Sequence, residues 1–183
     1  DSIYATAAAD DWLTLLRALA SLRPGELRHA LVSAFFDVSL GELAAADDGL
    51  LADWTATLRQ WDRTLTRSGV AALFAQINAE TTFIERVLGR PDGERLMTDF
   101  RHVTEVLHEA SGHHRPGAAW LADWLHREAT FLLDRWAQAD FGVTYADASL
   151  EQQGALEGRL KEVMRTNTYD TATGVITIDA DRA

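Results

Sequence analysis

The sequence contains no cysteine among its 183 residues. Disulfide bonds and thiolate metal ligands are therefore excluded, and with them the small folds that depend on either. A chain without cysteine fits a reducing compartment. Proline is also scarce, at three residues, and it is the residue that most disrupts helix interiors. The scarcity of proline favours a helical fold.

Long hydrophobic runs are missing as well. No apolar stretch approaches the ~20 residues that a membrane-spanning helix needs. The first residues, DSIYATAAADDW, lack the basic and apolar regions of a signal peptide. We therefore expect a cytoplasmic protein without membrane contact.

The motifs of several enzyme classes are absent. The sequence has no GxxxxGK[ST] phosphate-binding loop, no GxGxxG dinucleotide motif and no GxSxG nucleophile elbow. We therefore expect no catalytic residues, no cofactor-binding residues and no metal site in this chain.

Positive charge is in short supply. Lysine and arginine number 17 against 28 acidic residues, which gives a formal net charge of -11. Surfaces that bind duplex DNA through its phosphates are normally basic. The charge of the whole chain therefore argues against an autonomous nucleic-acid-binding module, although it leaves room for a local basic patch within a larger assembly.

Helical patterning is what the sequence has in abundance, most clearly from Pro91 to Gly112. Turn residues open this stretch, and a glycine that suits a helix C-terminus closes it. Between them, one apolar stripe recurs at steps of four and three: Leu96, Phe100, Val103, Leu107 and Ala110. Similar patterns predict helices over residues 7–22, 25–36, 51–67, 70–78, 82–88, 118–139 and 150–164, with a short capped helix beginning at Ser39.

A β-strand signal occurs once, in the β-branched segment from Thr173 to Asp179. A lone strand has no partner in an otherwise helical chain and is not stable alone. We therefore predict an all-α, multi-helix domain of about eight helices, followed by one short C-terminal strand that belongs to a neighbouring domain. This pattern also suggests that the chain is a piece of a larger protein.

Two Glu-x-x-His pairs have the spacing that di-iron helical bundles use, Glu26 with His29 and Glu105 with His108. Such a site needs both pairs to face the core. Helical geometry places Glu105 opposite the apolar stripe of its helix and the Glu26 pair off the stripe of its own. We interpret both as solvated surface pairs and keep a metal-binding helical bundle as a remote alternative.

Positively charged side chains gather around Pro91. They are Arg86, Arg90, Arg95, Arg101 and Arg115, together with His102 on the exposed face of the predicted helix. One interpretation is contact with DNA phosphates or with a partner protein. The other is ordinary ion pairing with Glu85, Glu94 and Asp99.

The six tryptophans allow a stacking platform for single-stranded nucleic acid as one interpretation. Five of them, all but Trp12, fall on long predicted helices beside leucines at core spacing. Stacking platforms usually lie among basic residues. We therefore favour core packing.

The wording of Gly93 to Ala110, GERLMTDFRHVTEVLHEA, resembles a phrase of the RecB family, the helicase-nuclease subunits of exodeoxyribonuclease V. The segments Trp61–Val70 and Ala119–Leu125, and the first four residues, resemble their counterparts in that family. Val175–Ile178 resembles the strand of a helicase motif that couples ATP to DNA. After it, Asp179 stands where the family has histidine, and Asp181 where it has serine.

The resemblance implies the 2B region of UvrD- and Rep-like superfamily 1 helicases, a helical insertion in the second RecA-like domain. Residues 1–172 are then a helical 2B-like accessory domain, and residues 173–183 belong to the adjacent helicase core. The implied role is regulatory contact with duplex DNA or with sister subunits of a RecBCD-like complex in double-strand-break repair and recombination.

The same resemblance places ATP, Mg²⁺ and the helicase and nuclease centres in other parts of the parent enzyme. We therefore expect neither ATP hydrolysis nor nuclease activity from these residues alone. A helical protein-interaction scaffold without DNA contact is the alternative, and the acidic charge of the chain favours it.

Overall fold

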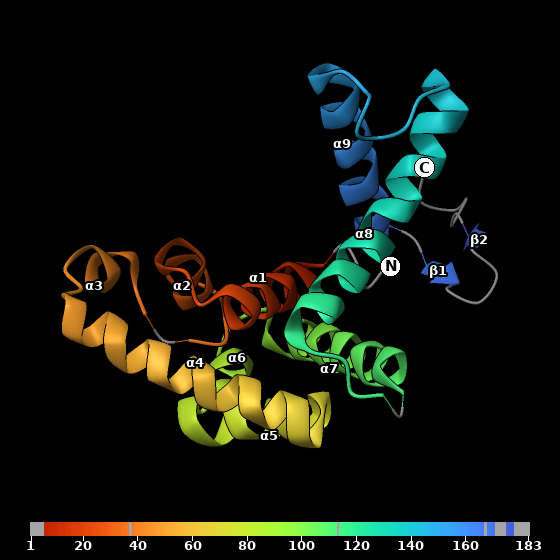
Figure 1. The fold of residues 1–183 in the computed structure, drawn as a ribbon. Coiled ribbons are helices and arrows are strands. Elements are labelled where there is room, and N and C mark those ends of the chain that lie inside the picture. Colours follow the sequence, from red (N-terminus) through yellow and green to blue (C-terminus); the bar gives the residue numbers. More distant parts are fainter. Residues whose placement is uncertain (1–5, 37, 113, 167, 171–174, 178–183) are drawn as a thin grey trace. The chain divides into compact units, whose positions relative to one another are not determined.

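The computed structural model of the chain describes residues 6–36, 38–112, 114–166, 168–170 and 175–177. Nine α-helices account for most of these residues (Figure 1). The predicted all-α class is therefore confirmed for the part of the chain that the structure describes. Contacts between Cα atoms divide the chain into a larger unit, Ala7–Leu125, and a second unit that includes the residues from His126 onward.

The larger unit contains seven complete helices and the beginning of an eighth. In chain order they are α1 (Ala7–Ser21), α2 (Pro24–Leu31), α3 (Leu40–Ala44), α4 (Asp48–Ser68), α5 (Val70–Thr81), α6 (Phe83–Leu88), α7 (Gly93–Ser111) and α8 (Ala118–Phe141), of which the residues up to Leu125 belong here. None of the described helices combines the length and apolarity that a membrane-spanning segment needs.

Helix α7 is the helix predicted from the apolar stripe between Pro91 and Gly112. Four residues of that stripe are buried, namely Leu96, Phe100, Val103 and Leu107. The helix packs against α1, α5 and α6, so its buried face touches both earlier and neighbouring parts of the chain. The predicted orientation of α7 is therefore confirmed.

Aromatic rings fill the centre of the larger unit. The ring centroid of Phe35 lies 5.0 Å from that of Trp12, 4.9 Å from that of Phe83 and 5.1 Å from that of Phe100. All four side chains are fully buried. Such ring pairs contribute about 0.5–1.5 kcal/mol each beyond the burial of their area. Because the rings come from α1, α6, α7 and the turn after α2, they join segments that are distant in sequence.

The tryptophans only partly follow the prediction of core packing. Trp12 and Trp61 are fully buried in the larger unit, and Trp136 is buried in the second unit. Trp120, by contrast, is 43% exposed. Trp12 lies among the central rings. It is the one tryptophan that is not assigned to the core from its spacing on a long helix.

The helix predicted over residues 25–36 ends early, and this is a correction. The structure has a turn in place of the last helical residues because tertiary partners take the backbone groups there. The Ala34 N–H donates to the Asp11 carboxylate at 3.0 Å. The Arg86 guanidinium donates to the carbonyl groups of residues 34, 35 and 36 at 3.4, 3.0 and 3.2 Å.

The corner between α6 and α7 depends on a glycine. Gly93 is buried, and a Cβ atom at this position would lie 2.2 Å from the carbonyl oxygen of Val87 and 2.9 Å from that of Leu88. Only a residue without a side chain allows this close approach. The glycine that opens the predicted helix is therefore also what lets α7 start directly against the end of α6.

The second unit contains the rest of α8, then α9 (Leu150–Thr166) and two short strands, β1 (Thr168–Asp170) and β2 (Val175–Thr177). The loop between the helices is tied to α8, since the Asp134 carboxylate accepts the Tyr145 N–H at 2.8 Å. The strands pair in antiparallel fashion, with Tyr169 opposite Ile176.

A C-terminal strand of the predicted length is not seen among the described residues. Of the predicted segment 173–179, β2 covers three residues. It pairs with β1, whereas the sequence pattern predicts no partner strand. Residues 173, 174, 178 and 179 lie outside the described residues, as does the predicted domain boundary between residues 172 and 173. That boundary stays a prediction.

Candidate nucleic-acid interface

The six residues predicted to contact DNA or a partner all lie in the larger unit, on α6, α7 and the segments that flank α7. The fold distributes them over three environments. These are the turn after α2 (Arg86, Arg90), one edge of α7 (Arg95, His102) and the other edge of α7 with the loop that follows it (Arg101, Arg115).

Arg86 is occupied by the fold itself. Its guanidinium Nε donates to the Thr81 carbonyl oxygen at 2.9 Å, and its terminal nitrogens bind three successive carbonyl groups of residues 34–36. The side chain is partly buried between these segments. A guanidinium has five N–H donors in a fixed plane, which suits such a row of acceptors. Arg86 is thus a structural residue of the turn after α2.

Arg90 lies near the same turn but is more open. Its Nε is 3.4 Å from the Asp92 carboxylate, and the two side chains are 51% and 62% exposed. Exposed pairs of this kind contribute little to stability, about 0–1 kcal/mol. Ion pairing is one of the two predicted roles for the arginines, and here the partner is Asp92.

Asp11, a partly buried residue of α1 near Arg90, has a carboxyl group with a shifted pKa. Burial raises the pKa of Asp11 to about 6, and this outweighs the opposite effects of the Ala34 N–H bond and the Arg90 charge. Arg86 and Arg90 also line an open pocket of about 470 Å³ next to this turn. The arginines of this region therefore interact with groups of the protein itself. The charge of Arg90 acts on the Asp11 carboxyl group, and Arg86 binds a row of carbonyl groups.

Arg95 and His102 share one edge of α7, because residues seven apart return to the same side of a helix. Both are exposed. Asp99 lies between them along this edge, and burial raises the pKa of its carboxyl group, while the charges of Arg95 and His102 lower it. One acidic side chain thus partly offsets the positive charge of this edge.

Arg101 lies about 100° around the helix from His102, on the other edge of α7. His108, seven residues further on, shares that edge. Both side chains are exposed. The α7 arginines therefore point to different sides of the helix.

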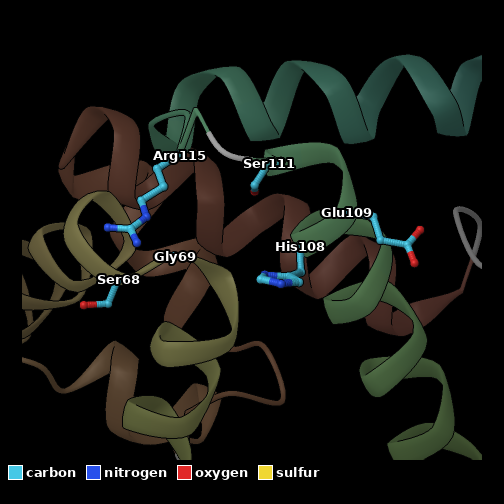
Figure 2. Close-up of a pocket in the computed structure, with 7 residues that line it drawn as sticks. Ser68, Gly69, His108, Glu109, Ser111 and Arg115 are labelled. Carbon is cyan, nitrogen blue, oxygen red and sulfur yellow. The ribbon is translucent and has the colours of Figure 1, made fainter.

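A pocket of about 460 Å³ opens at the C-terminal end of α7 (Figure 2). Its lining comes from the α4–α5 junction, the end of α7 and the following loop: Ser68, Gly69, His108, Glu109, Ser111, Gly112 and Arg115. In Figure 2, the Arg115 side chain and the His108 ring are directed toward the Ser68–Gly69 junction, whereas Glu109 points away from it.

Backbone geometry shapes this pocket. Gly69 has a φ of 87°, which favours glycine, and it begins α5 without any side-chain cap on the helix N-terminus. Arg115 donates a hydrogen bond to the Arg67 carbonyl oxygen at the end of α4. A guanidinium, an imidazole and an uncapped helix N-terminus are groups that attract anions.

The sequence pattern identifies Arg115 but not the residues that surround it. It marks His108 only by its spacing to Glu105, and the Ser68–Gly69 step only as a helix end. The sequence pattern does not predict that the α4–α5 junction lies next to the end of α7, because that proximity follows from packing of α5 on α7.

The remote metal-bundle alternative gains no support in the part of the chain that the structure describes. There, no three His, Asp or Glu side chains are close enough together to hold a metal ion. Glu26 and His29 lie on α2, and Glu105 and His108 lie on α7. Among the described residues, these two pairs form no such cluster.

One protein family, the cytochrome c-like domain of the NorB subunit of nitric oxide reductase, matches residues 115–183. This is less than half of the chain. These residues contain no cysteine, so they lack the Cys-x-x-Cys-His motif to which a c-type haem attaches. This match does not show the family of the chain.

Curated relatives match a longer part. The chain is 41% identical over 128 residues to a protein of Mycobacterium tuberculosis and 39% identical over 129 residues to one of Mycolicibacterium smegmatis; each match covers 69% of the chain. A Haemophilus influenzae protein is 26% identical over 130 residues, or 70% of the chain. These relatives are subunits of RecBCD enzymes.

In each case the subunit is RecB. Over the matched segment the chain belongs to the RecB family, and the resemblance found in the sequence is confirmed. The match covers 12% of the length of the two mycobacterial relatives and 11% of the third. The chain thus spans only a small part of a full RecB subunit.

Proposed function

We propose that the chain is the 2B-like accessory domain of an ATP-dependent helicase-nuclease that acts in DNA double-strand-break repair and recombination. The observation that carries this proposal is the 41% identity to a RecB subunit over 128 residues. The all-helical larger unit and the absence of nucleotide-binding and nucleophile motifs fit a domain without chemistry of its own. In this proposal, ATP and Mg²⁺ bind elsewhere in the parent enzyme.

The domain acts by contact, either with duplex DNA or with sister subunits of a RecBCD-like complex. For DNA, the best-placed residues are those of the α7 edge that leads to the pocket, Arg101 and Arg115. Arg101 is exposed, and Arg115 and His108 converge on the uncapped start of α5. Both edges carry carboxylates, Asp99 near Arg95 and His102, and Glu105 one turn from Arg101. We rank the pocket edge first because Arg115 and His108 converge there.

Fork-DNA binding tests this proposal. The affinity of the chain for a fluorescent forked duplex is measured by anisotropy over a range of salt concentrations. Arg101→Glu with Arg115→Glu is compared with Arg95→Glu, and with Arg63→Glu on the exposed face of α4 as the matched control. We expect binding that weakens with salt, and the double variant should lower the salt slope by about one per lost phosphate contact.

The outcomes separate the two modes of contact. Weaker binding in the double variant, with Arg63→Glu unchanged, supports DNA contact through the pocket edge. Equal effects of Arg63→Glu and the α7 variants indicate only a general response to charge. A chain that binds no forked DNA at low salt rules out DNA contact by this domain.

The second candidate is a helical scaffold that binds sister subunits and not DNA. The specific observation in its favour is the net charge of -11, because a DNA-binding surface is normally basic. In this case the chain shows no binding to forked DNA, while the domain still associates with partner subunits.

A further inference from the structure

The structure contains a second surface, at the opposite end of α4 from the pocket. Helix α3 has no buried residue, and the buried residues of α4 begin only at Leu58. Leu40 on α3 is 75% exposed, and Leu50 on α4 is 37% exposed. Figure 1 shows α3 beside the start of α4 at one end of the larger unit. An apolar helix face is thus left without a partner.

A groove of about 470 Å³ runs between α3 and α4. Its apolar lining is formed by Val38, Ala45, Ala46, Leu50 and Trp54. The Trp54 ring packs edge-on against buried Phe36, with ring centroids 5.1 Å apart. The floor of the groove is therefore anchored on the core, whereas its mouth is open and can receive side chains.

Local signals hold α3 in place despite its lack of burial. The Ser39 N–H donates to the Glu42 carboxylate at 2.8 Å, and the Glu42 N–H donates to the Ser39 hydroxyl at 3.2 Å. Arg28 donates to the Leu43 carbonyl oxygen at 3.3 Å. A five-residue helix has no stability of its own in water, since most helical stability comes from tertiary packing. The capped helix therefore presents an apolar face while gaining little from it.

The charged side chains that line the groove are acidic, and Arg28 lies nearby, where it donates to the Leu43 carbonyl oxygen. Glu42 and Asp47 line it, and Asp48 and Asp53 are exposed on the first turns of α4. Between Arg28 and Arg59 the sequence has no lysine or arginine. The Ser39 hydrogen bonds also keep the pKa of Glu42 below its usual value, so this carboxylate is ionised at neutral pH. The rim is thus acidic around an apolar floor.

We infer that this groove docks a basic amphipathic helix of a partner protein. Apolar side chains of such a helix, spaced at i, i+3, i+4 and i+7, enter the groove, and flanking lysine or arginine side chains meet the acidic rim. The charges steer the encounter, and the apolar contacts slow dissociation. This inference rests on the α3–α4 region and stands whether or not α7 contacts DNA.

Peptide binding to the 183-residue chain tests the inference. The probe is a synthetic helix of about 14 residues, with leucine at the groove-facing positions and lysine elsewhere. A second peptide keeps the leucines and replaces lysine by glutamate. We expect the lysine peptide to bind and to shift the indole N–H resonance of Trp54, and the glutamate peptide to do neither.

Matched variants locate the site. Leu50→Ser changes a leucine that lines the groove, and Leu40→Ser changes the exposed leucine of α3; together they should weaken binding of the lysine peptide at least about tenfold. Leu150→Ser, which changes a leucine 87% exposed in the second unit, should leave its affinity unchanged. Asp48→Asn with Asp53→Asn should weaken binding at low salt, whereas Asp123→Asn with Glu151→Gln, two exposed acids on α8 and α9, should not.

Four outcomes overturn the inference. The first is unchanged affinity in the Leu40 and Leu50 variant. The second is an equal loss with the Asp123 and Glu151 control, which means that the peptide responds only to net charge. The third is a dimer in sedimentation that the leucine variant dissociates, because a second copy then fills the groove. The fourth is failure of a full-length RecB-type protein with these residues to bind the peptide, because its own chain then covers the groove.

Discussion

Asp11 is a carboxyl group placed where its charge is unfavourable. It lies on α1, is partly buried, and accepts the Ala34 N–H that would otherwise continue α2. Burial raises its pKa from the ordinary value of 3.8 to about 6. Between these two pH values the folded state holds a proton that the unfolded chain has lost. Stability from this group is therefore greatest in acid and falls as the pH rises through this range.

The Asp11→Asn variant isolates this effect. Asparagine keeps an oxygen acceptor for the Ala34 N–H but does not titrate. We expect similar free energies of unfolding for the variant and the parent chain near pH 4, and a more stable variant above about pH 6, by up to roughly 3 kcal/mol. Urea titrations at several pH values measure the difference. A constant difference over this range contradicts the prediction.

Arg86 differs from the other predicted contact residues because its donors face the protein. Arg86→Met keeps the aliphatic stem and leaves the carbonyl groups of residues 34–36 without their donor. We expect a loss of about 2 kcal/mol in the free energy of unfolding. Arg86→Lys should lose more than half of this free energy, because a single ammonium group cannot replace the planar set of donors of the guanidinium.

Arg101→Met is the control for Arg86, because Arg101 is exposed on α7 and its change should stay within about 0.5 kcal/mol. Chemical denaturation of the three variants gives the comparison. A fully stable Arg86→Met variant with weaker fork-DNA binding would show that Arg86 contacts DNA and does not hold the turn.

At the scale of elements, the corner between α6 and α7 depends on close backbone approach. Gly93→Ala places a methyl group within 2.2 Å of the Val87 carbonyl oxygen. We expect a loss of about 1–3 kcal/mol, because backbone at a packed corner cannot move away easily. Gly154→Ala on α9 is the matched control, since no atom lies within 4 Å of its Cβ position.

Thermal unfolding of the two glycine variants provides the measurement. The Gly154→Ala chain should be as stable as the parent or slightly more so, because alanine favours helix interiors. If both variants unfold at the temperature of the parent, the α6–α7 corner is not limited by the glycine.

At the scale of the whole molecule, the net charge of -11 hides an uneven distribution. Helix α4 has 21 residues and is therefore about 30 Å long. The acidic groove lies at its first turns, and the pocket with Arg115 and His108 lies at its end. The two surfaces are far enough apart to be tested independently, since charges this far apart in solvent are screened from each other.

The fork-DNA and peptide experiments consequently give distinct results. If the chain binds the peptide but no forked DNA, the proposed DNA contact is wrong and the α3–α4 inference stands. If it binds forked DNA but not the peptide, the α3–α4 inference is wrong and the DNA contact stands. If it binds both, the domain has two contact surfaces, as an accessory domain between DNA and a partner subunit requires.

The sequence alone determined the helical class, most helix positions and the family. Apolar side chains three and four residues apart report their own helix face, so α7 and its buried stripe were predictable from Leu96 to Leu107. The phrase from Gly93 to Ala110 carried the family resemblance. Both are local properties of the chain, and local properties can be read directly from a sequence.

Tertiary structure alone decided what depends on distant residues. The early end of α2 required Asp11 and Arg86 to take its backbone partners. The pocket at Gly69 required α5 to pack on α7. Each results from contacts between segments far apart in the chain, and helical periodicity holds no information about which segments meet.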